Sequence, residues 1–302
     1  MFNKKFNLLK EATEYGFMPY METYILDGKK RPIVVIFPGG GYGMVSEREA
    51  ERIAMAYNAA GFHAAVVYYC VEPHTHPLPI QNAANAVAML RENAEKWNID
   101  TDKVIVCGFS AGGHLAASLS ALWNDSEIFS EREIELAMHK PNAQILSYPV
   151  ITSGEFAHKD SFKNLTGTDD ESNHLWSSLS LERRITDIIP PTFLWHTYED
   201  ICVPVENTLM YAAGLRRVGV PFELHIFEKG EHGLSRVSDE LIWSKRKFER
   251  EYPWLSLSVD WLNQLFSIDE AERAARLYDA NRNTGNEVLD VVLTEKSLLC
   301  ES

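Results

Sequence analysis

Three residues of this chain have the types and the sequence context that acyl transfer requires: Ser110, Asp200 and His232. A serine hydroxyl becomes a nucleophile when a histidine takes its proton and a carboxylate holds that histidine in the right tautomer. Ser110 is the centre of Gly-Phe-Ser-Ala-Gly at residues 108–112, between an apolar run and an alanine-rich run. This context favours a sharp strand-to-helix turn over an ordinary helix-capping serine, or over the chance match expected in roughly one chain in ten.

His232 is the predicted base among the ten histidines. It follows the last predicted strand, and glycines on both sides give its loop the freedom to reach Ser110. His196, at the end of another predicted strand, is the rival, although we favour a half-buried histidine with satisfied hydrogen bonds there. His114 comes one helical turn after Ser110, so we expect it to pack beneath the turn.

Asp200 is the predicted acid that orients the base. It lies in the acidic loop Thr-Tyr-Glu-Asp at residues 197–200, directly after a predicted strand. A short carboxylate near the apex of this loop can meet the second nitrogen of His232. Glu199 is the next candidate and Asp187 a more distant third, and a solvated acidic loop is the alternative interpretation for all three.

A glycine-rich loop, Pro-Gly-Gly-Gly-Tyr-Gly at residues 38–43, follows another predicted strand. Its backbone amides are uncovered by side chains, so they can approach a developing oxyanion. The amide of Ala111, next to the predicted nucleophile, would complete such an oxyanion hole. The loop lacks the Gly-Lys-Ser/Thr ending of a P-loop and the spacing of a dinucleotide fingerprint. We therefore disfavour phosphate binding and expect no cofactor.

The elements that must position these residues follow the pattern of an α/β protein. Short β-branched runs alternate with longer amphipathic segments, which predicts a doubly wound, mostly parallel sheet with ligands at the carboxyl ends of its strands. Parallel strands are predicted at 33–37, 64–69, 103–107, 143–147, 192–196 and 222–227, after an antiparallel edge strand at 20–26. Helices are predicted at 48–60, 78–97, 111–123, 205–218 and 256–266.

Two segments depart from this alternation. Residues 149–191 place aromatic side chains among polar ones between two strands, which predicts a small insertion over the carboxyl edge that serves as a lid or pocket wall. A plain surface excursion is the alternative. We assign Trp176 of this insertion and Tyr42 to the substrate pocket. Residues 1–267 are interpreted as one domain, and 268–302 as an extension that docks on the body or on a second subunit.

Composition and charge narrow the class of protein. The 302 residues are 45% hydrophobic and carry a formal net charge of -14, so nucleic acid is an unsuitable partner. No stretch approaches a membrane span, and the start of the chain lacks the apolar core of a secretory signal. The four cysteines are far apart, which is typical of reduced thiols in a cytoplasmic protein. His74 and His76 have no third ligand at a sensible spacing, so we expect no metal site.

Together these motifs resemble the α/β-hydrolase family, and within it the esterase/lipase group whose oxyanion loop reads His-Gly-Gly-Gly. The order Ser, Asp, His along the chain is the order expected of that fold. Pro38 replaces the histidine of the loop here. Alignment with the motif implies that the amides of Gly40 and Gly41 are the oxyanion donors, together with Ala111.

More narrowly, residues 37–42, 190–196 and 200–207 resemble bacterial acetyl xylan esterase-like proteins. This resemblance implies a serine carboxylesterase that removes acetyl groups from plant-polysaccharide oligosaccharides. A general lipase, esterase or peptidase of the same fold is one alternative, and a catalytically inactive hydrolase-fold binding protein is another. The expected partner is a small-molecule ester. The sequence does not decide between a monomer and a homo-oligomer.

Overall fold

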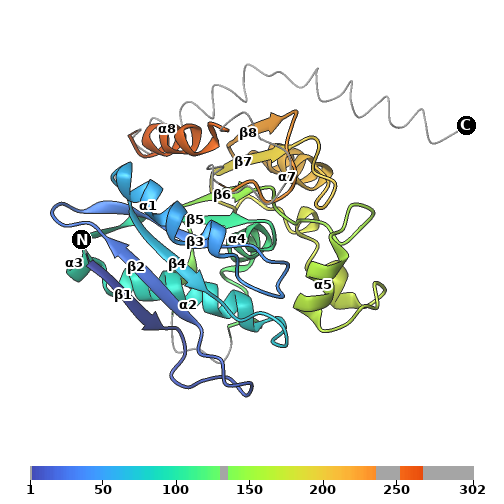
Figure 1. Ribbon diagram of the computed structural model, residues 1–302, viewed down its shortest axis with the longest axis horizontal. Helices are drawn as coiled ribbons and strands as arrows, with labels where there is room; N and C mark the ends of the chain where they lie inside the picture. Colours follow the sequence, from blue (N-terminus) through green and yellow to red (C-terminus); the bar gives the residue numbers. More distant parts are fainter. Residues whose placement is uncertain (1, 130–134, 236–251, 268–302) are drawn as a thin grey trace, which may run out of the picture. The chain divides into compact units, whose positions relative to one another are not determined.

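The computed structural model describes residues 2–129, 135–235 and 252–267. These residues contain an eight-stranded sheet in the order β1-β2-β4-β3-β5-β6-β7-β8 (Figure 1). The strands from β3 to β8 are parallel, and β2 is antiparallel to both of its neighbours. Their bounds are β1 Phe2–Asn7, β2 Tyr20–Ile25, β3 Arg31–Phe37, β4 His63–Tyr68, β5 Ile99–Phe109, β6 Ala143–Ser147, β7 Thr192–Thr197 and β8 Phe222–Phe227.

The predicted doubly wound, mostly parallel sheet is confirmed, but the predicted edge strand is wrong. β2 is antiparallel as expected, yet β1 pairs along its outer side and forms the edge. The sequence of β1 gives a weak strand signal because Lys4 and Lys5 are exposed and only Phe2 and Phe6 face an apolar partner, Trp97. Lysine side chains of this kind protect an exposed edge from pairing with another chain.

Helices lie close to the predicted positions, although two predicted helices are each divided. In place of the predicted helix 48–60, the chain forms a 3-10 turn η1, Glu47–Glu49, followed by the helix α1, Glu51–Ala59. Residues 78–97 form α2, Leu78–Glu92, and α3, Ala94–Trp97. The remaining helices are α4 Ala111–Leu122, α5 Lys159–Thr166, α6 His174–Ser178, α7 Glu206–Val218 and α8 Trp254–Ser267, with 3-10 turns η2 Leu136–His139 and η3 Leu181–Arg183.

Both faces of the sheet are covered, as its apolar strands require. On one face Ile33, Val35 and Phe37 of β3 join a core built with α2 and α4. On the other face Trp254, at the start of α8, stacks on Trp195 of β7 with ring centroids 5.2 Å apart. Figure 1 shows α1 on the opposite side of the sheet from α2 and α4.

The insertion between β6 and β7 carries α5, α6 and η3. Its Phe162 lies 5.4 Å from the ring of His114 on α4 and 5.4 Å from Trp176 on α6, so the segment packs on the body through an aromatic cluster. The role of this segment as a lid or pocket wall stays a prediction. The described residues up to Val259 belong to one compact unit, and those from Asp260 onward belong to a second. The interpretation of residues 1–267 as one domain stays a prediction. The predicted extension, 268–302, lies outside the described residues.

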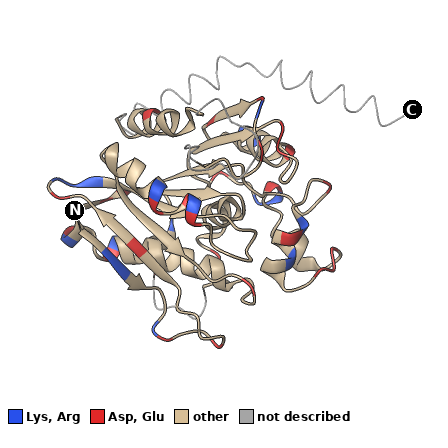
Figure 2. Cartoon of the chain, viewed as in Figure 1, with Lys and Arg blue, Asp and Glu red and all other residues tan. Residues whose placement is uncertain are grey.

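The charged residues of the helices are mixed in sign. Lysine and arginine alternate with aspartate and glutamate around α1 and α5, so neither charge gathers on these helices (Figure 2). Among the described residues, no helix combines the length and the apolar character needed to cross a membrane.

Candidate active site

Ser110 occupies a strained turn between β5 and α4, with φ +53° and ψ −120°. A serine adopts this conformation only when the surrounding structure imposes it. Gly112 permits the turn because a Cβ there would lie 2.0 Å from the carbonyl oxygen of Phe37 and 2.5 Å from that of Pro38. The predicted elbow therefore exists, and it lies directly against the start of the glycine-rich loop.

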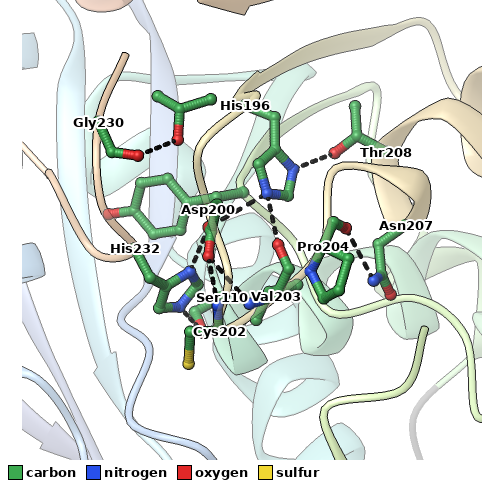
Figure 3. Close-up of polar contacts among 12 residues, drawn as sticks. Ser110, His196, Asp200, Cys202, Val203, Pro204, Asn207, Thr208, Gly230 and His232 are labelled. Atoms are coloured by element: carbon green, nitrogen blue, oxygen red, sulfur yellow. Dashed lines mark hydrogen bonds and ion pairs between the residues drawn. The ribbon is translucent and has the colours of Figure 1, made fainter. Parts of the chain in front are cut away.

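Ser110, His232 and Asp200 form a continuous chain of hydrogen bonds (Figure 3). His232 Nε2 lies 2.8 Å from Ser110 Oγ, and its Nδ1 lies 2.6 Å from Asp200 Oδ2. An ionised carboxylate only accepts hydrogen bonds, so Nδ1 carries the hydrogen and Nε2 is free to accept the proton of the serine. The three residues come from the loops after β5, β8 and β7, as predicted.

Asp200 is held by four donors. Its Oδ1 accepts from the amides of Cys202, at 3.0 Å, and Val203, at 2.9 Å. Its Oδ2 accepts from His232 and, at 3.2 Å, from Nε2 of His196. Burial alone would raise the pKa of Asp200, but the hydrogen bonds from His196 and His232 outweigh it and the pKa is lowered well below its usual value. The carboxylate is therefore ionised at neutral pH.

His196 supports Asp200 and cannot replace His232 as the base. Its Nε2 also lies 2.9 Å from the carbonyl oxygen of Val203, which can only accept, so this nitrogen carries the hydrogen. Its Nδ1 accepts from the hydroxyl of Thr208 at 2.7 Å. The side chain is completely buried rather than half-buried, with both nitrogens occupied (Figure 3).

The other two acids considered for Asp200's role lie elsewhere. Glu199 accepts from the Lys229 ammonium at 2.9 Å and from the amide of Gly230 at 3.3 Å, which ties the loop after β7 to the loop that carries His232. Asp187 is exposed in the segment before β7.

The glycine-rich loop is pinned at two points. Its first amide, Gly39 N, donates to Glu49 Oε2 at 2.7 Å, and the carbonyl of Gly41 accepts from Asn164 Nδ2 at 2.9 Å. Gly40 and Gly41 have φ of +126° and +64°, a turn that favours glycine. Within the described part of the chain, the amides of Gly40, Gly41 and Ala111 donate to no other group. They are therefore available to a ligand at the predicted oxyanion hole.

The two predicted pocket residues lie in the hydrophobic core. Tyr42 is 1% exposed, and its hydroxyl lies 2.9 Å from Nδ1 of His114, which packs beneath the elbow as expected. Trp176 is 2% exposed, and its Nε1 donates to the carbonyl of Thr168 at 3.1 Å. Neither side chain offers appreciable surface to a substrate, because Tyr42 packs against Tyr69 and His114, and Trp176 packs against Phe162.

Sequence reasoning missed the residues that connect these loops. Asn207, in the first turn of α7, accepts from the amides of Ile151 and Thr152 at 2.9 and 3.1 Å. Its Nδ2 donates to the carbonyls of Phe156 and Pro204 at 2.9 and 3.0 Å, so it joins the insertion to the Asp200 loop. Glu49 was missed as well, although the replacement of the loop histidine by proline was a signal that another side chain must hold the loop.

A mostly parallel sheet with a serine elbow after β5, an acid after β7 and a histidine after β8 defines the α/β-hydrolase fold. Solved structures agree with this class. A structure described as an acetyl ester-xyloside bifunctional hydrolase from Caldicellulosiruptor lactoaceticus is 35% identical, with a TM-score of 0.76 over 88% of this chain and 97% of that one. A carboxylesterase from Lactobacillus plantarum WCFS1 is 25% identical, with a TM-score of 0.73 over 89% of this chain and 99% of its own.

The chain belongs to the BD-FAE family, whose model matches residues 21–215. Endo-1,4-beta-xylanase B of Butyrivibrio fibrisolvens is 37% identical over 78% of this chain, and an acetylxylan esterase of Xylanibacter ruminicola is 31% identical over 66% of it. The matches cover 38% and 40% of these two proteins, so the chain spans about two fifths of the length of the curated relatives.

Proposed function

We propose that this protein is a serine carboxylesterase that hydrolyses acetyl esters of plant-polysaccharide oligosaccharides. The observation that carries the proposal is the hydrogen-bonded chain from Ser110 through His232 to Asp200 at the elbow. The names of the similar acetylxylan esterase and acetyl ester-xyloside hydrolase support the acetyl group and the sugar.

The mechanism follows from the positions of the three side chains. Ser110 Oγ attacks the acetyl carbonyl carbon while its proton passes to His232 Nε2, and the oxyanion accepts hydrogen bonds from the free amides of the hole. When the tetrahedral intermediate collapses, the bond to the sugar oxygen breaks and the imidazolium returns the proton to that oxygen. Water, deprotonated by the same histidine, then attacks the acetyl-enzyme, and acetate leaves as Ser110 regains its proton.

The first test removes the nucleophile. We expect Ser110→Ala to lower kcat/KM for phenyl acetate by about three orders of magnitude or more, because only the residual stabilisation by the hole and by binding remains. Initial rates of the purified variant, with circular dichroism to confirm folding, measure this. Activity within tenfold of wild type would contradict the serine mechanism.

A second set of measurements separates the alternatives. Release of acetate from acetylated xylo- and manno-oligosaccharides is expected, together with a preference for acetyl over butyryl and octanoyl esters. A preference for octanoyl esters would favour a general lipase. Failure of a fluorophosphonate probe to label folded wild-type protein would favour an inactive binding protein.

A further inference from the structure

A second buried carboxylate, Glu49, lies next to the candidate active site and has no part in the mechanism above. It is the last residue of η1, and it is 3% exposed. Its Oε2 accepts from Gly39 N at 2.7 Å, and its Oε1 lies 2.7 Å from the hydroxyl of Tyr148. A Cβ built at Gly39 would lie 3.0 Å from Cβ of Ser110 and 2.8 Å from Glu49 Oε2, so the carboxylate is close to the elbow.

The two hydrogen-bond donors that face Glu49 indicate that its carboxyl group is ionised. The hydroxyl of Tyr148 already accepts from the amide of Ser235 at 2.9 Å. Its own hydrogen therefore needs an acceptor, and Glu49 Oε1 is the acceptor that the described residues provide. The other carboxylate oxygen faces the N–H of Gly39. A proton on either oxygen of Glu49 would oppose a donor, so the carboxylate form fits both contacts.

Tyr148 extends this contact to the loop that carries His232. Ser235, three residues after His232, donates its amide to the Tyr148 hydroxyl and its own hydroxyl to the carbonyl of Arg48 at 2.9 Å. The ring of Tyr148 also meets the ring of His232 edge-on, with centroids 5.1 Å apart. One carboxylate thus joins the glycine-rich loop, through Gly39, to the histidine loop, through Tyr148.

We propose that Glu49 is a positioning residue of the esterase, an inference that rests on the proposed function. Through Gly39 it fixes the amides of Gly40 and Gly41 at the oxyanion hole, and through Tyr148 it fixes the loop of His232. Its negative charge also stabilises the imidazolium that His232 becomes when Ser110 attacks, because opposite charges attract strongly in a buried site.

The surrounding charges agree in sign with this role. Burial raises the pKa of Glu49 above its usual value, and the Tyr148 and Gly39 hydrogen bonds and the positive charges of His232 and Arg48 offset only part of that rise. Among the described residues, the titratable and charged groups around this pair include Asp200, His158, Tyr148, Arg48, Tyr69 and Cys107. Removing the charge of Glu49 leaves Asp200 in place but withdraws one of the two anions that stabilise the imidazolium form of His232.

The test compares Glu49→Gln with two matched variants. Glu47→Gln removes the same charge from an exposed position of the same turn, and Tyr148→Phe breaks the link to Ser235 while the Glu49 charge remains. For Glu49→Gln we expect kcat for phenyl acetate to fall by about ten- to a hundredfold with KM within about threefold, because ground-state binding is unaffected. The acid limb of kcat/KM against pH should move down by about half a pH unit or more.

For Tyr148→Phe we expect kcat to fall by about fivefold or more. The acid limb of its kcat/KM against pH should match that of wild type, because the charge of Glu49 remains. Glu47→Gln should match wild type both in kcat and in the acid limb of kcat/KM against pH. Wild-type kcat in Tyr148→Phe overturns the proposal by itself, even if Glu49→Gln does not fold. An unshifted acid limb in folded Glu49→Gln also overturns it.

A substrate-independent measurement separates this inference from the proposed function. The rate of Ser110 labelling by a fluorophosphonate reports the reactivity of the serine and histidine without any carboxylic ester substrate. If wild type labels but hydrolyses no acetyl ester, the proposed substrate is wrong and Glu49 is still tested by labelling rates. Slower labelling of Glu49→Gln than of Glu47→Gln is expected, and equal rates overturn the role of Glu49.

Discussion

His232, His196 and His114 are all close to the elbow, and their hydrogen-bond partners decide which one can take a proton. His114 donates from Nε2 to the carbonyl of Leu179 at 2.9 Å and accepts from Tyr42 at Nδ1. His196 is likewise saturated between Thr208 and Val203. His232 alone of the three presents an accepting nitrogen to Ser110. Loop position in the sequence selects His232 as the base, but it does not reveal that His196 holds Asp200.

The buried state of His114 predicts how stability depends on pH. Burial lowers its pKa to about 4, from an ordinary value near 6.5. Between these two values the unfolded chain binds a proton at this site and the folded protein does not. The stabilising contribution is therefore fully present above about pH 6.5 and is lost as the pH falls toward about 4.

Replacing this histidine should flatten that dependence. We expect the free energy of unfolding of wild type to fall between about pH 6 and about pH 4.5 more steeply than that of His114→Gln, by on the order of 1.4 kcal/mol per pH unit. Urea unfolding of both proteins at several pH values measures the two slopes. Equal slopes would mean that His114 is protonated in the folded protein.

At the scale of elements, the approach of α4 to β3 controls the elbow. We expect Gly112→Ala to lower esterase activity by more than tenfold and to destabilise the fold by about 1–3 kcal/mol, because its Cβ meets the backbone oxygens of Phe37 and Pro38, which cannot move independently of the sheet. Gly154→Ala is the control, since a Cβ there meets a side-chain oxygen, that of Thr152, at 3.2 Å on an exposed segment. Loss of activity in both variants to the same extent would argue against a specific role of this contact.

Elements with a buried face were predictable from sequence, whereas those without one were not. Most of the predicted parallel strands are apolar runs that the sheet buries on both sides, for example β3 and β6, whereas β8 is partly exposed along its length. β1 lacks such a run, and the break between α2 and α3 at Asn93 depends on a local bond from its side chain to the carbonyl of Met89.

The same limit applies to the site. Ser110, Asp200 and His232 were predictable because each follows a strand and its residue type fits one chemical role. Glu49 and Tyr148 are 99 positions apart, and neither lies in a sequence motif from which their contact could be predicted. Tyr42 and Trp176 were assigned to the pocket from residue type and from their segments of the chain, and these do not distinguish a pocket aromatic from one that fills the core.

At the scale of the whole molecule, the formal net charge of -14 should repel anionic esters from the protein. We expect kcat/KM for the anionic ester para-acetoxybenzoate to rise several-fold between roughly 0.01 M and roughly 0.1 M salt, because salt screens its repulsion from the protein. The value for neutral phenyl acetate should stay constant, which makes it the internal control. A salt-independent rate for the anionic ester would show that the net charge does not act at the entrance.

The bond from Asn164 of the insertion to the carbonyl of Gly41 means that specificity and turnover are not independent traits of this scaffold. Under the proposed function, residues 149–191 are the segment to exchange for that of a relative when a different sugar specificity is wanted. Such a chimaera would inherit a new wall and, at the same time, a new anchor for the oxyanion loop. Under the proposed function, a variant with a different specificity must therefore retain the side-chain amides at positions 164 and 207, or its turnover will be slower.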